Sequence, residues 1–192
     1  MTVAHPKMTL EEFLQFEDGT EYRYELENGE LIQMAAESEI NMRIVMLLVA
    51  TFLQMGIPFY RLRIGSEIMV NSQMVGVRVP DLVVFSEELA EALKGASRSL
   101  ITFDLPAPML IVEVVSPNQE KRDYHYKRSE YSARGIPEYW IIDPMQGKVP
   151  ILEWVEGMYK ERVFAGEERL VSPQLGNLSL TAQFLLSAGA IP

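Results

Sequence analysis

A strand–helix–strand unit constrains the fold of this chain more than any other feature. Residues Met109–Val115 form an apolar run that only Glu113 interrupts, a pattern typical of a strand covered on both faces. The turn Ser116-Pro117-Asn118 follows, where Pro117 or Asn118 can begin a helix that stops at Gly135. Tyr139–Asp143 then reads as a second buried strand. We therefore expect two parallel strands joined by a right-handed helical crossover.

Three elements are predicted in the N-terminal part of the chain. A short helix begins at Thr9, with Glu12 completing a capping box. Asn28-Gly29 supplies the two residues of a type I′ turn, which predicts a hairpin. A longer helix runs from Ser38 to Met55 and ends at Gly56.

The long N-terminal helix is predicted to be buried on more than one side. Its main apolar face consists of Ile40, Ile44, Leu47, Leu48, Thr51, Phe52 and Met55. Met42, Met46 and Val49 widen that face.

Further patterns complete a mixed α/β (α+β) fold. We expect a mixed sheet flanked by helices, with antiparallel strands at the C-terminal end, in one domain over residues 1–192. The other predicted strands are Phe59–Ile64, Ser66–Val70, Val77–Phe85, Pro150–Trp154, Tyr159–Phe164 and Glu168–Val171, and the other helices are Glu87–Lys94 and Thr181–Ser187.

Composition excludes several classes of protein. The 192 residues contain no cysteine, so disulfides, thiol nucleophiles and cysteine-bound metals are excluded. We expect no membrane partner, because the longest apolar stretch, Ile44–Phe52, is half the length of a membrane span. The first residues lack the apolar segment of a signal peptide, so we expect a cytoplasmic protein.

The net charge of −10 argues against a broad nucleic-acid-binding surface. Residues 1–40 hold ten acids and two bases, which leaves −2 for the rest of the chain. A local basic rim on an acidic chain and a set of ordinary solvated charges are both compatible with this pattern. The bases in question are Arg61, Arg63, Arg78, Lys121, Arg122, Lys127, Arg128 and Arg134.

Two acids stand inside apolar strand-like runs. Asp81 lies in Val79–Val84 and Glu113 in Ile111–Val115. A carboxylate buried in a strand is costly unless it is paired or binds a metal. Two of them on neighbouring strands would make a hard oxygen site suited to Mg²⁺ or Mn²⁺. The alternative is a structural role for each acid: Asp81 as a strand-end residue after Pro80 that accepts a backbone hydrogen bond, and Glu113 as a buried acid paired with Arg or Lys.

Lys127 is the candidate cation for this site. The helix runs back along the strand, so a residue about seven positions into it returns to the level of Glu113. Because helical side chains lean toward the N-terminus, Lys127 can reach Glu113, whereas Lys121 sits too near the helix start. Asp123 lies four residues before Lys127 on the same face. The alternative is a surface ion pair between Asp123 and Lys127.

The ordered set of motifs resembles the Uma family of restriction-endonuclease-like proteins. It consists of Tyr24–Leu31, Pro80-Asp81, Glu113, Ser116-Pro117, Asp123, Lys127, Tyr131, Gly135 and Glu138–Pro144, and it covers nearly the whole chain. The resemblance implies a PD-(D/E)XK nuclease core in which Asp81 and Glu113 hold a divalent metal. It also implies a supporting glutamate on the first core helix, for which Glu39 is the nearest match, with Glu37 just before it.

One position departs from that superfamily's pattern. The lysine usually found two residues after the second acid is replaced here by Val115. In members like this chain the resemblance implies that Lys127 on the following helix takes its place. Asp81, Glu113 and Lys127 are thus the predicted catalytic residues, with Glu39 and Asp123 in support.

Three functions remain in competition at this stage. The first is a Mg²⁺- or Mn²⁺-dependent endonuclease that cuts DNA. The second is a catalytically inactive module of the same fold that binds DNA or protein, which the Val115 substitution and the acidic charge favour. The third is an assembly protein that forms a homodimer through its apolar helix Ile40–Met55, which is compatible with either of the others.

Overall fold

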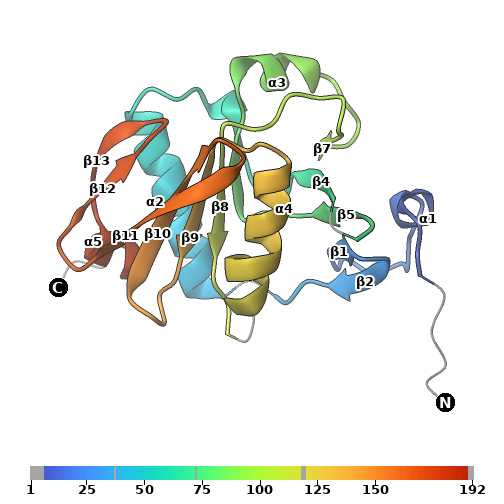
Figure 1. Cartoon of the computed structure of the whole chain (residues 1–192), viewed down its shortest axis with the longest axis horizontal. Helices are drawn as coiled ribbons and strands as arrows, with labels where there is room; N and C mark the ends of the chain where they lie inside the picture. Colours follow the sequence, from blue (N-terminus) through green and yellow to red (C-terminus); the bar gives the residue numbers. More distant parts are fainter. Residues whose placement is uncertain (1–6, 37, 72, 118–119, 190–192) are drawn as a thin grey trace.

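The computed structural model describes residues 7–36, 38–71, 73–117 and 120–189 (Figure 1). The helical segments are α1 (Leu10–Leu14), α2 (Glu39–Gln54), η1 (Phe59–Arg61), α3 (Glu87–Ala92), η2 (Arg122–Lys127), α4 (Arg128–Ala133) and α5 (Ala182–Leu186). The strands are β1 (Tyr24–Glu27), β2 (Glu30–Gln33), β3 (Leu62–Arg63), β4 (Glu67–Asn71), β5 (Val75–Arg78), β6 (Leu82–Val84), β7 (Leu100–Ile101), β8 (Leu110–Val114), β9 (Glu138–Ile142), β10 (Lys148–Val155), β11 (Met158–Ala165), β12 (Arg169–Ser172) and β13 (Gly176–Thr181).

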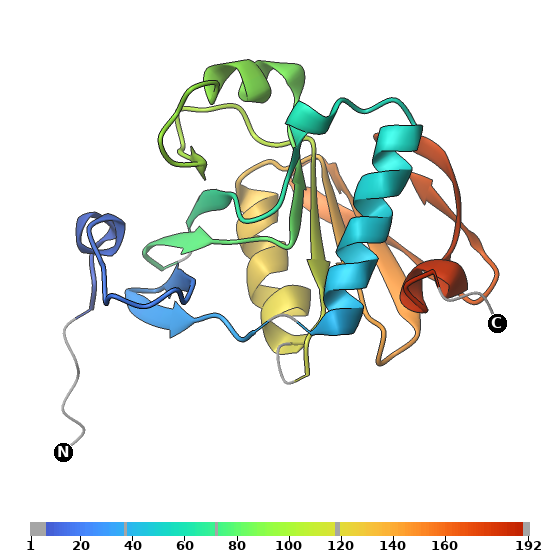
Figure 2. The same cartoon turned by 180° about the vertical axis from the view of Figure 1, so that it is seen from behind.

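The larger sheet has the strand order β11-β10-β9-β8-β6-β3. Strands β8 and β9 are parallel neighbours, with Leu110 opposite Glu138 and Val114 opposite Ile142. The helical segment η2–α4 connects them and lies on one face of the sheet, and α2 lies on the other (Figures 1 and 2). The predicted strand–helix–strand unit is therefore confirmed.

Apolar side chains cover both faces of the larger sheet. On one face Leu48 of α2 packs in a cluster with Trp140. On the other, Tyr131 of α4 packs with Ile111 and Tyr139. All five residues of β8 are buried, and each large apolar side chain contributes about 1.5–3 kcal/mol on burial. This explains why β8 reads as a continuous apolar run instead of an alternating one.

The smaller sheet has the order β2-β1-β5-β4-β7. Its first two strands form the predicted hairpin, in which Asn28 and Gly29 both have positive φ angles, 51° and 81°. Strand β1 pairs with β5 through Leu26 and Val77. Gly76 makes this pairing possible, because a Cβ atom there would lie 2.6 Å from the Leu26 carbonyl oxygen.

The prediction of a single strand over residues 77–85 is wrong, because two strands lie there. Strand β5 ends at Arg78 in the smaller sheet, and β6 begins at Leu82 in the larger one. Pro80 lies between them and has no N–H for a strand ladder, so the chain changes sheet there. Asp81 consequently lies at the junction of the two sheets and not inside a strand.

Two further strand predictions need correction. The run 59–64 is mostly the helical turn η1, followed by the two-residue strand β3. Strands β10 and β11 are antiparallel neighbours, as expected for the C-terminal strands, and the turn between them has positive φ at Glu156 and Gly157, but β12 does not pair with them. Strand β12 pairs with β13, which was not predicted, and Glu138 accepts hydrogen bonds from the Ser172 hydroxyl (2.9 Å) and the Gln174 N–H (2.8 Å) in the turn between them.

Helix α2 begins after its N-cap Ser38 and ends before Met55, as predicted. Its buried face is centred on Ile44, Leu48 and Phe52, which pack on the larger sheet. The prediction of burial on more than one side is wrong, because Met42 and Met46 are 42% and 51% exposed. A helix on one face of a sheet buries one stripe only, and the methionines flank it.

The architecture is therefore mixed α/β with two mixed sheets, as predicted for the fold class. Within the described ranges, the structure contains no helix with the length and apolar character that a membrane span requires.

Candidate active site

Asp81 and Glu113 are brought together by the pairing of β6 with β8. The two strands are antiparallel, with Leu82 opposite Val112, so the residue before β6 lies beside the end of β8. The Asp81 carboxylate accepts a hydrogen bond from the Val114 N–H at 2.5 Å. This contact ties the junction of the two sheets to the strand that carries Glu113.

Lys127 completes the pairing predicted from the sequence. Its ammonium lies 2.8 Å from the Glu113 carboxylate and 3.0 Å from that of Asp123. The residue is buried, so the alternative of a surface ion pair with Asp123 does not describe it. Segment η2, which carries both Asp123 and Lys127, is a turn of π-helix, a feature found frequently at functional sites.

The contact of Tyr131 with Glu113 was not predicted from the sequence. Its hydroxyl donates a hydrogen bond of 2.7 Å to the second oxygen of Glu113, and the ring is fully buried. The available signal was its spacing, four residues after Lys127 on the same helix face. Glu113 is thus held from one side by Lys127 and Tyr131 together.

Glu25 is a second residue of the site that could not be assigned from the sequence. It is buried in β1, and its carboxylate lies 3.9 Å from the Lys127 ammonium. We call Glu25, Asp81, Glu113, Asp123 and Lys127 the Lys127 cluster. The available signal was an acid in the middle of a hairpin strand, flanked by Tyr24 and Leu26.

Burial and charge shift the titration of this cluster. Burial raises the pKa of the Glu113 carboxyl well above its ordinary value, Lys127 opposes that shift, and Asp81 and Asp123 add to it. Burial alone would lower the pKa of Lys127, but Glu113, Glu25 and Asp123 raise it above its ordinary value. Lys127 is therefore a firmly charged group among crowded carboxylates.

A second set of buried charges supports the cluster from the side of the smaller sheet. The Arg78 network consists of Glu25, Glu27, Arg78, Arg122 and Glu130. Arg78 is fully buried and binds Glu130 through two nitrogens, at 2.7 and 2.9 Å. The third guanidinium nitrogen of Arg78 donates to Glu25 at 3.1 Å and to Glu27 at 2.6 Å. Arg122 of η2 also binds Glu25, at 2.5 Å. Glu25 therefore belongs to both groups and links the hairpin to the helix of Lys127.

The supporting glutamate expected on α2 is not brought to the cluster. Glu39 is exposed on the first turn of the helix, and Glu37 lies outside the described residues. Asn41, two residues further on, is buried instead and donates to the Ser116 hydroxyl at 3.0 Å and to the Val114 carbonyl at 3.5 Å. The expected helix start at Asn118 also lies outside the described residues, and the described helix begins at Glu120.

The model of the Uma2 family, described as "Putative restriction endonuclease", matches residues 10–183 of this chain. The chain belongs to the Uma2 family. A search of curated proteins finds no match.

A solved structure from Anabaena variabilis, described as "a putative nuclease belonging to DUF820", has the same fold as this Uma2 chain. The two share 21% sequence identity with a TM-score of 0.75, over 95% of this chain and 99% of the other. At this level of identity the likeness establishes the fold alone.

The Uma2 family description, that of a restriction endonuclease, implies use of a divalent metal. The carboxylates of this cavity fit Mg²⁺, an ion that needs few protein ligands. Asp81, Glu113 and Asp123 line a cavity of about 70 Å³ together with Lys127. Within the described part of the chain, no group of three or more His, Cys, Asp or Glu side chains has the arrangement of a metal site. Two carboxylates are nevertheless sufficient for Mg²⁺, which fills its remaining positions with water and phosphate oxygens. Each oxygen of Glu113 also has a second lone pair beyond its present contact.

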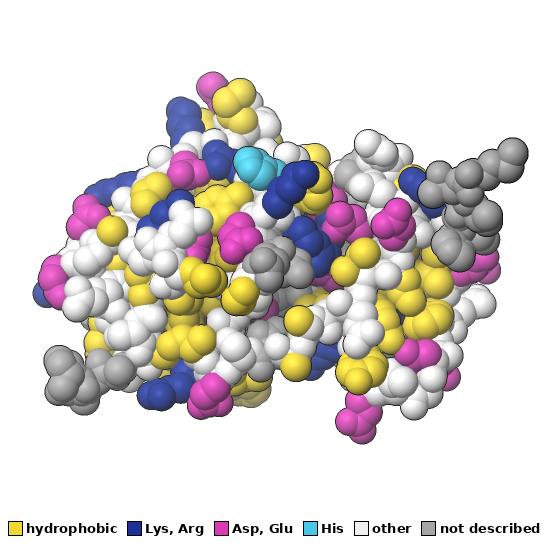
Figure 3. Space-filling model, turned by 90° about the horizontal axis from the view of Figure 1, so that it is seen from below, with side chains coloured by type: hydrophobic (Ala, Val, Ile, Leu, Met, Phe, Trp, Pro, Cys, Tyr) yellow, Lys and Arg dark blue, Asp and Glu magenta, His cyan; other side chains and the backbone are white. Residues whose placement is uncertain are grey.

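Several of the bases that could have formed a local basic rim are buried or held in ion pairs. Arg78 is buried, Arg128 binds Glu161 at 2.5 Å, and Arg61 lies 3.4 Å from Glu87. Acidic and basic side chains are interspersed with apolar ones on the face of the molecule toward which β8 runs (Figure 3). These bases are therefore poorly placed to form a broad track for a phosphate backbone.

Proposed function

We propose that this chain is a metal-dependent endonuclease that hydrolyses phosphodiester bonds of DNA. The observation that carries the proposal is the convergence of Asp81, Glu113 and Lys127 on one cavity, from a strand junction, a strand end and a helix. The Uma2 family description supports the same reaction class. Under this proposal residues 1–192 act as one domain.

Asp81 and Glu113 would hold Mg²⁺ or Mn²⁺. The ion, when bound, supplies charge neutralisation at the scissile phosphate and lowers the pKa of a water molecule. Lys127 orients the attacking water and offsets negative charge that develops on the phosphoryl oxygens. Water adds to phosphorus and releases one proton to solvent, while the bond to the leaving sugar oxygen breaks and that oxygen takes up one proton from solvent.

Asp123 and Tyr131 position these groups. Asp123 holds the Lys127 ammonium at 3.0 Å, and Tyr131 fixes the Glu113 carboxylate at 2.7 Å. Val115, at the usual lysine position, is buried in the apolar cluster under α4. A lysine there would enter that core, so the cation is delivered from the helix instead.

A second candidate is an inactive module of the same fold that binds DNA or protein. Both oxygens of Glu113 already have a partner, Lys127 or Tyr131, so the cluster is satisfied without an ion. A site retained for folding alone would have the same contacts. Cleavage therefore distinguishes the two candidates.

The deciding experiment is the conversion of supercoiled plasmid to nicked or linear DNA in Mg²⁺ or Mn²⁺. We expect the wild type to cleave, and Asp81→Asn and Glu113→Gln to fall to background while remaining folded by circular dichroism. Glu88→Gln, which changes an exposed acid on α3, serves as the matched control and should cleave like the wild type. Cleavage by both site variants at the wild-type rate would refute the proposal.

The expectations of a homodimer and of a cytoplasmic location stay predictions. Helix α2 leaves Ile40, Met42, Met46 and Leu53 exposed, which is compatible with a contact between copies of the chain.

A further inference from the structure

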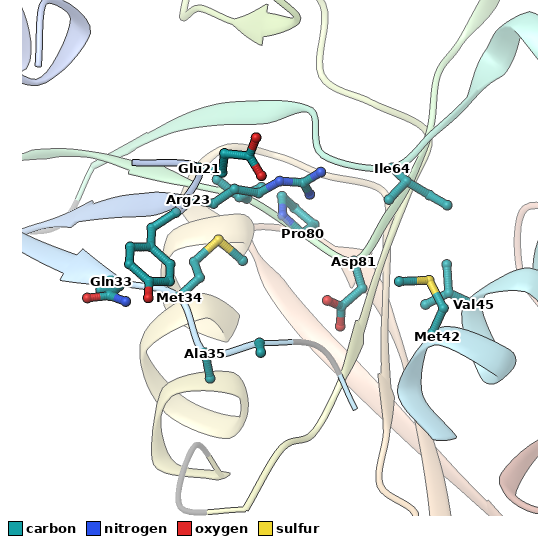
Figure 4. A pocket seen from close by; sticks show the side chains of 13 residues that line it. Glu21, Arg23, Gln33, Met34, Ala35, Met42, Val45, Ile64, Pro80 and Asp81 are labelled. Carbon is teal, nitrogen blue, oxygen red and sulfur yellow. The ribbon is translucent and has the colours of Figure 1, made fainter. Parts of the chain in front are cut away.

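A second cavity opens directly beside Asp81. Its volume is about 330 Å³, near the lower end of the roughly 300–1,000 Å³ range of small-molecule sites. It lies at the seam of the two sheets, where the segment before β1, the loop after β2, helix α2 and the β5–β6 junction meet (Figure 4). It therefore lies between the two sheets, and Val45 of the apolar core on the larger sheet forms part of its wall.

This seam cavity adjoins the candidate active site. Gln33, Met34, Ala35, Ala36 and Asp81 line both the seam cavity and the smaller cavity of the Lys127 cluster. Figure 4 shows the Asp81 carboxylate between Met34 and Ala35 on one side and Met42 and Ile64 on the other. A molecule in the seam cavity would thus touch the group proposed to hold the metal.

The walls of the seam cavity are apolar and partly open to solvent. Tyr22, Met42 and Ile64 line it and are 61%, 42% and 46% exposed. Large apolar groups gathered around a hollow mark a binding site more often than chance exposure does. Methionine sulfur and a tyrosine ring are also favourable surfaces for a flat aromatic ligand.

The polar groups of the cavity suit a nucleobase better than a phosphate. Among the described residues that line it, Arg23 is the only cation, and Glu21 and Asp81 accompany it. A phosphate would be held better by several cations or by converging backbone N–H groups. Gln33 offers both a donor and an acceptor for the edge of a base. Gly65 leaves room for the Arg23 guanidinium, since a Cβ there would lie 3.0 Å from its nitrogen.

We propose that the seam cavity binds one unpaired nucleobase of the substrate, next to the phosphate that is cleaved. This inference rests on the proposed function, because it assumes a nucleic-acid substrate. A base can enter such a cavity only after it leaves its partner and its stack. The substrate is therefore single-stranded, or unpaired at the cleaved position.

The test measures binding without cleavage, in metal-free buffer. The probe is a short fluorescein-labelled oligothymidylate, followed by fluorescence anisotropy, alone and paired with its complement. We expect Met42→Glu to weaken binding of the single strand about tenfold, the value of roughly one stacked base. We expect the wild type to bind the single strand more tightly than the duplex, because a duplex must first unpair a base.

Met46→Glu is the matched control. Met46 lies one turn further along α2, is 51% exposed and is not part of the cavity wall. Both variants add one negative charge to the same face of the helix, so a loss through general repulsion or through contact between copies of the chain would appear in both. We expect Met46→Glu to bind within about twofold of the wild type.

Three results would overturn the inference: equal loss in the two methionine variants, no loss in Met42→Glu, or duplex binding as tight as that of the single strand. If Met42→Glu proves unstable to heating, Ile64→Gln tests the opposite wall with the same expected loss. The outcome is separable from the proposed function, because plasmid cleavage depends on Asp81 and Glu113 and this binding does not require metal.

Discussion

At the residue scale, single contacts set the charge and orientation of the Glu113 carboxylate. The carboxylate is buried at the end of β8, and burial raises its pKa while Lys127 opposes the shift. The Tyr131 hydroxyl stabilises the carboxylate as a donor and fixes the direction in which its oxygens point. Tyr131 does not line the cavity, so under the proposed function we expect it to act by positioning Glu113.

Tyr131→Phe tests that dependence. The variant removes one hydroxyl donor, so we expect metal affinity and cleavage to fall about 10–100-fold, and the free energy of unfolding to fall by about 1 kcal/mol. Tyr139→Phe is the matched control, since the Tyr139 hydroxyl is equally buried but donates to the Asp123 backbone carbonyl at 3.1 Å. Calorimetry and urea unfolding measure the two effects. A loss of metal affinity as large in Tyr139→Phe would contradict a specific role for Tyr131.

Some of the candidate residues could be found from sequence because their chemistry conflicts with their surroundings. Asp81 and Glu113 are acids in apolar runs, and Lys127 follows from the rise of a helix against that of a strand. Tyr131 looks like an ordinary core aromatic. Glu25 gives a weaker signal still, because its partner Arg78 is 53 residues away and lies in another strand.

At the scale of elements, the Arg78 network fixes the hairpin β1–β2 against the larger sheet. Arg78 ends β5, Glu130 belongs to α4, and Glu25 and Glu27 come from β1. Removing one partner of a buried ion pair leaves the other charges uncompensated in a low-dielectric interior. The network therefore couples the N-terminal hairpin to the helix that carries Lys127.

Glu25→Gln should destabilise the protein by about 3 kcal/mol at neutral pH. Burial raises the pKa of Glu25, but Lys127, Arg78 and Arg122 outweigh burial and lower it below the ordinary value of 4.5. Glu25 therefore contributes stability above pH 4.5, and the contribution disappears as the pH falls through its lower folded-state pKa. The difference in the free energy of unfolding between the wild type and Glu25→Gln should therefore become smaller as the pH falls below 4.5.

Glu27→Gln provides the control for this prediction. Glu27 contacts the same two arginines, but its side chain is 17% exposed, so water compensates part of the loss. We expect the free energy of unfolding of Glu27→Gln, measured by urea at neutral pH, to fall by about 1 kcal/mol. Equal losses of stability in the two variants, or a loss in Glu25→Gln that does not change with pH, would contradict a stabilising role for the buried charge of Glu25.

Elements with local signals were predicted well, and elements that depend on distant partners were not. The caps of α1 and α2 and the Asn28-Gly29 turn are local, and the structure confirms them. The change of sheet at Pro80 depends on pairing with β1 on one side and β8 on the other. The buried stripe of α2 was misjudged because methionines are compatible with both core and surface. The π-helical form of η2 likewise has no periodic signal of its own.

At the scale of the whole molecule, the two sheets meet where the candidate chemistry lies. The smaller sheet contributes Glu25 and the network behind it, the larger sheet contributes Glu113, and the junction between them contributes Asp81. The seam cavity opens at the same place. With a net charge of −10, the molecule has little general attraction for nucleic acid, so under the proposed function we expect recognition to come from this seam.

The most direct test of the central claim is a calorimetric titration of Mn²⁺ into the wild type, Asp81→Asn and Glu113→Gln at neutral pH. We predict one saturable binding event in the wild type that both variants lose, because the ion needs both carboxylates. Glu88→Gln should bind like the wild type. Absence of binding in the wild type, or unchanged binding in both site variants, would contradict the assignment of Asp81 and Glu113 as a metal site.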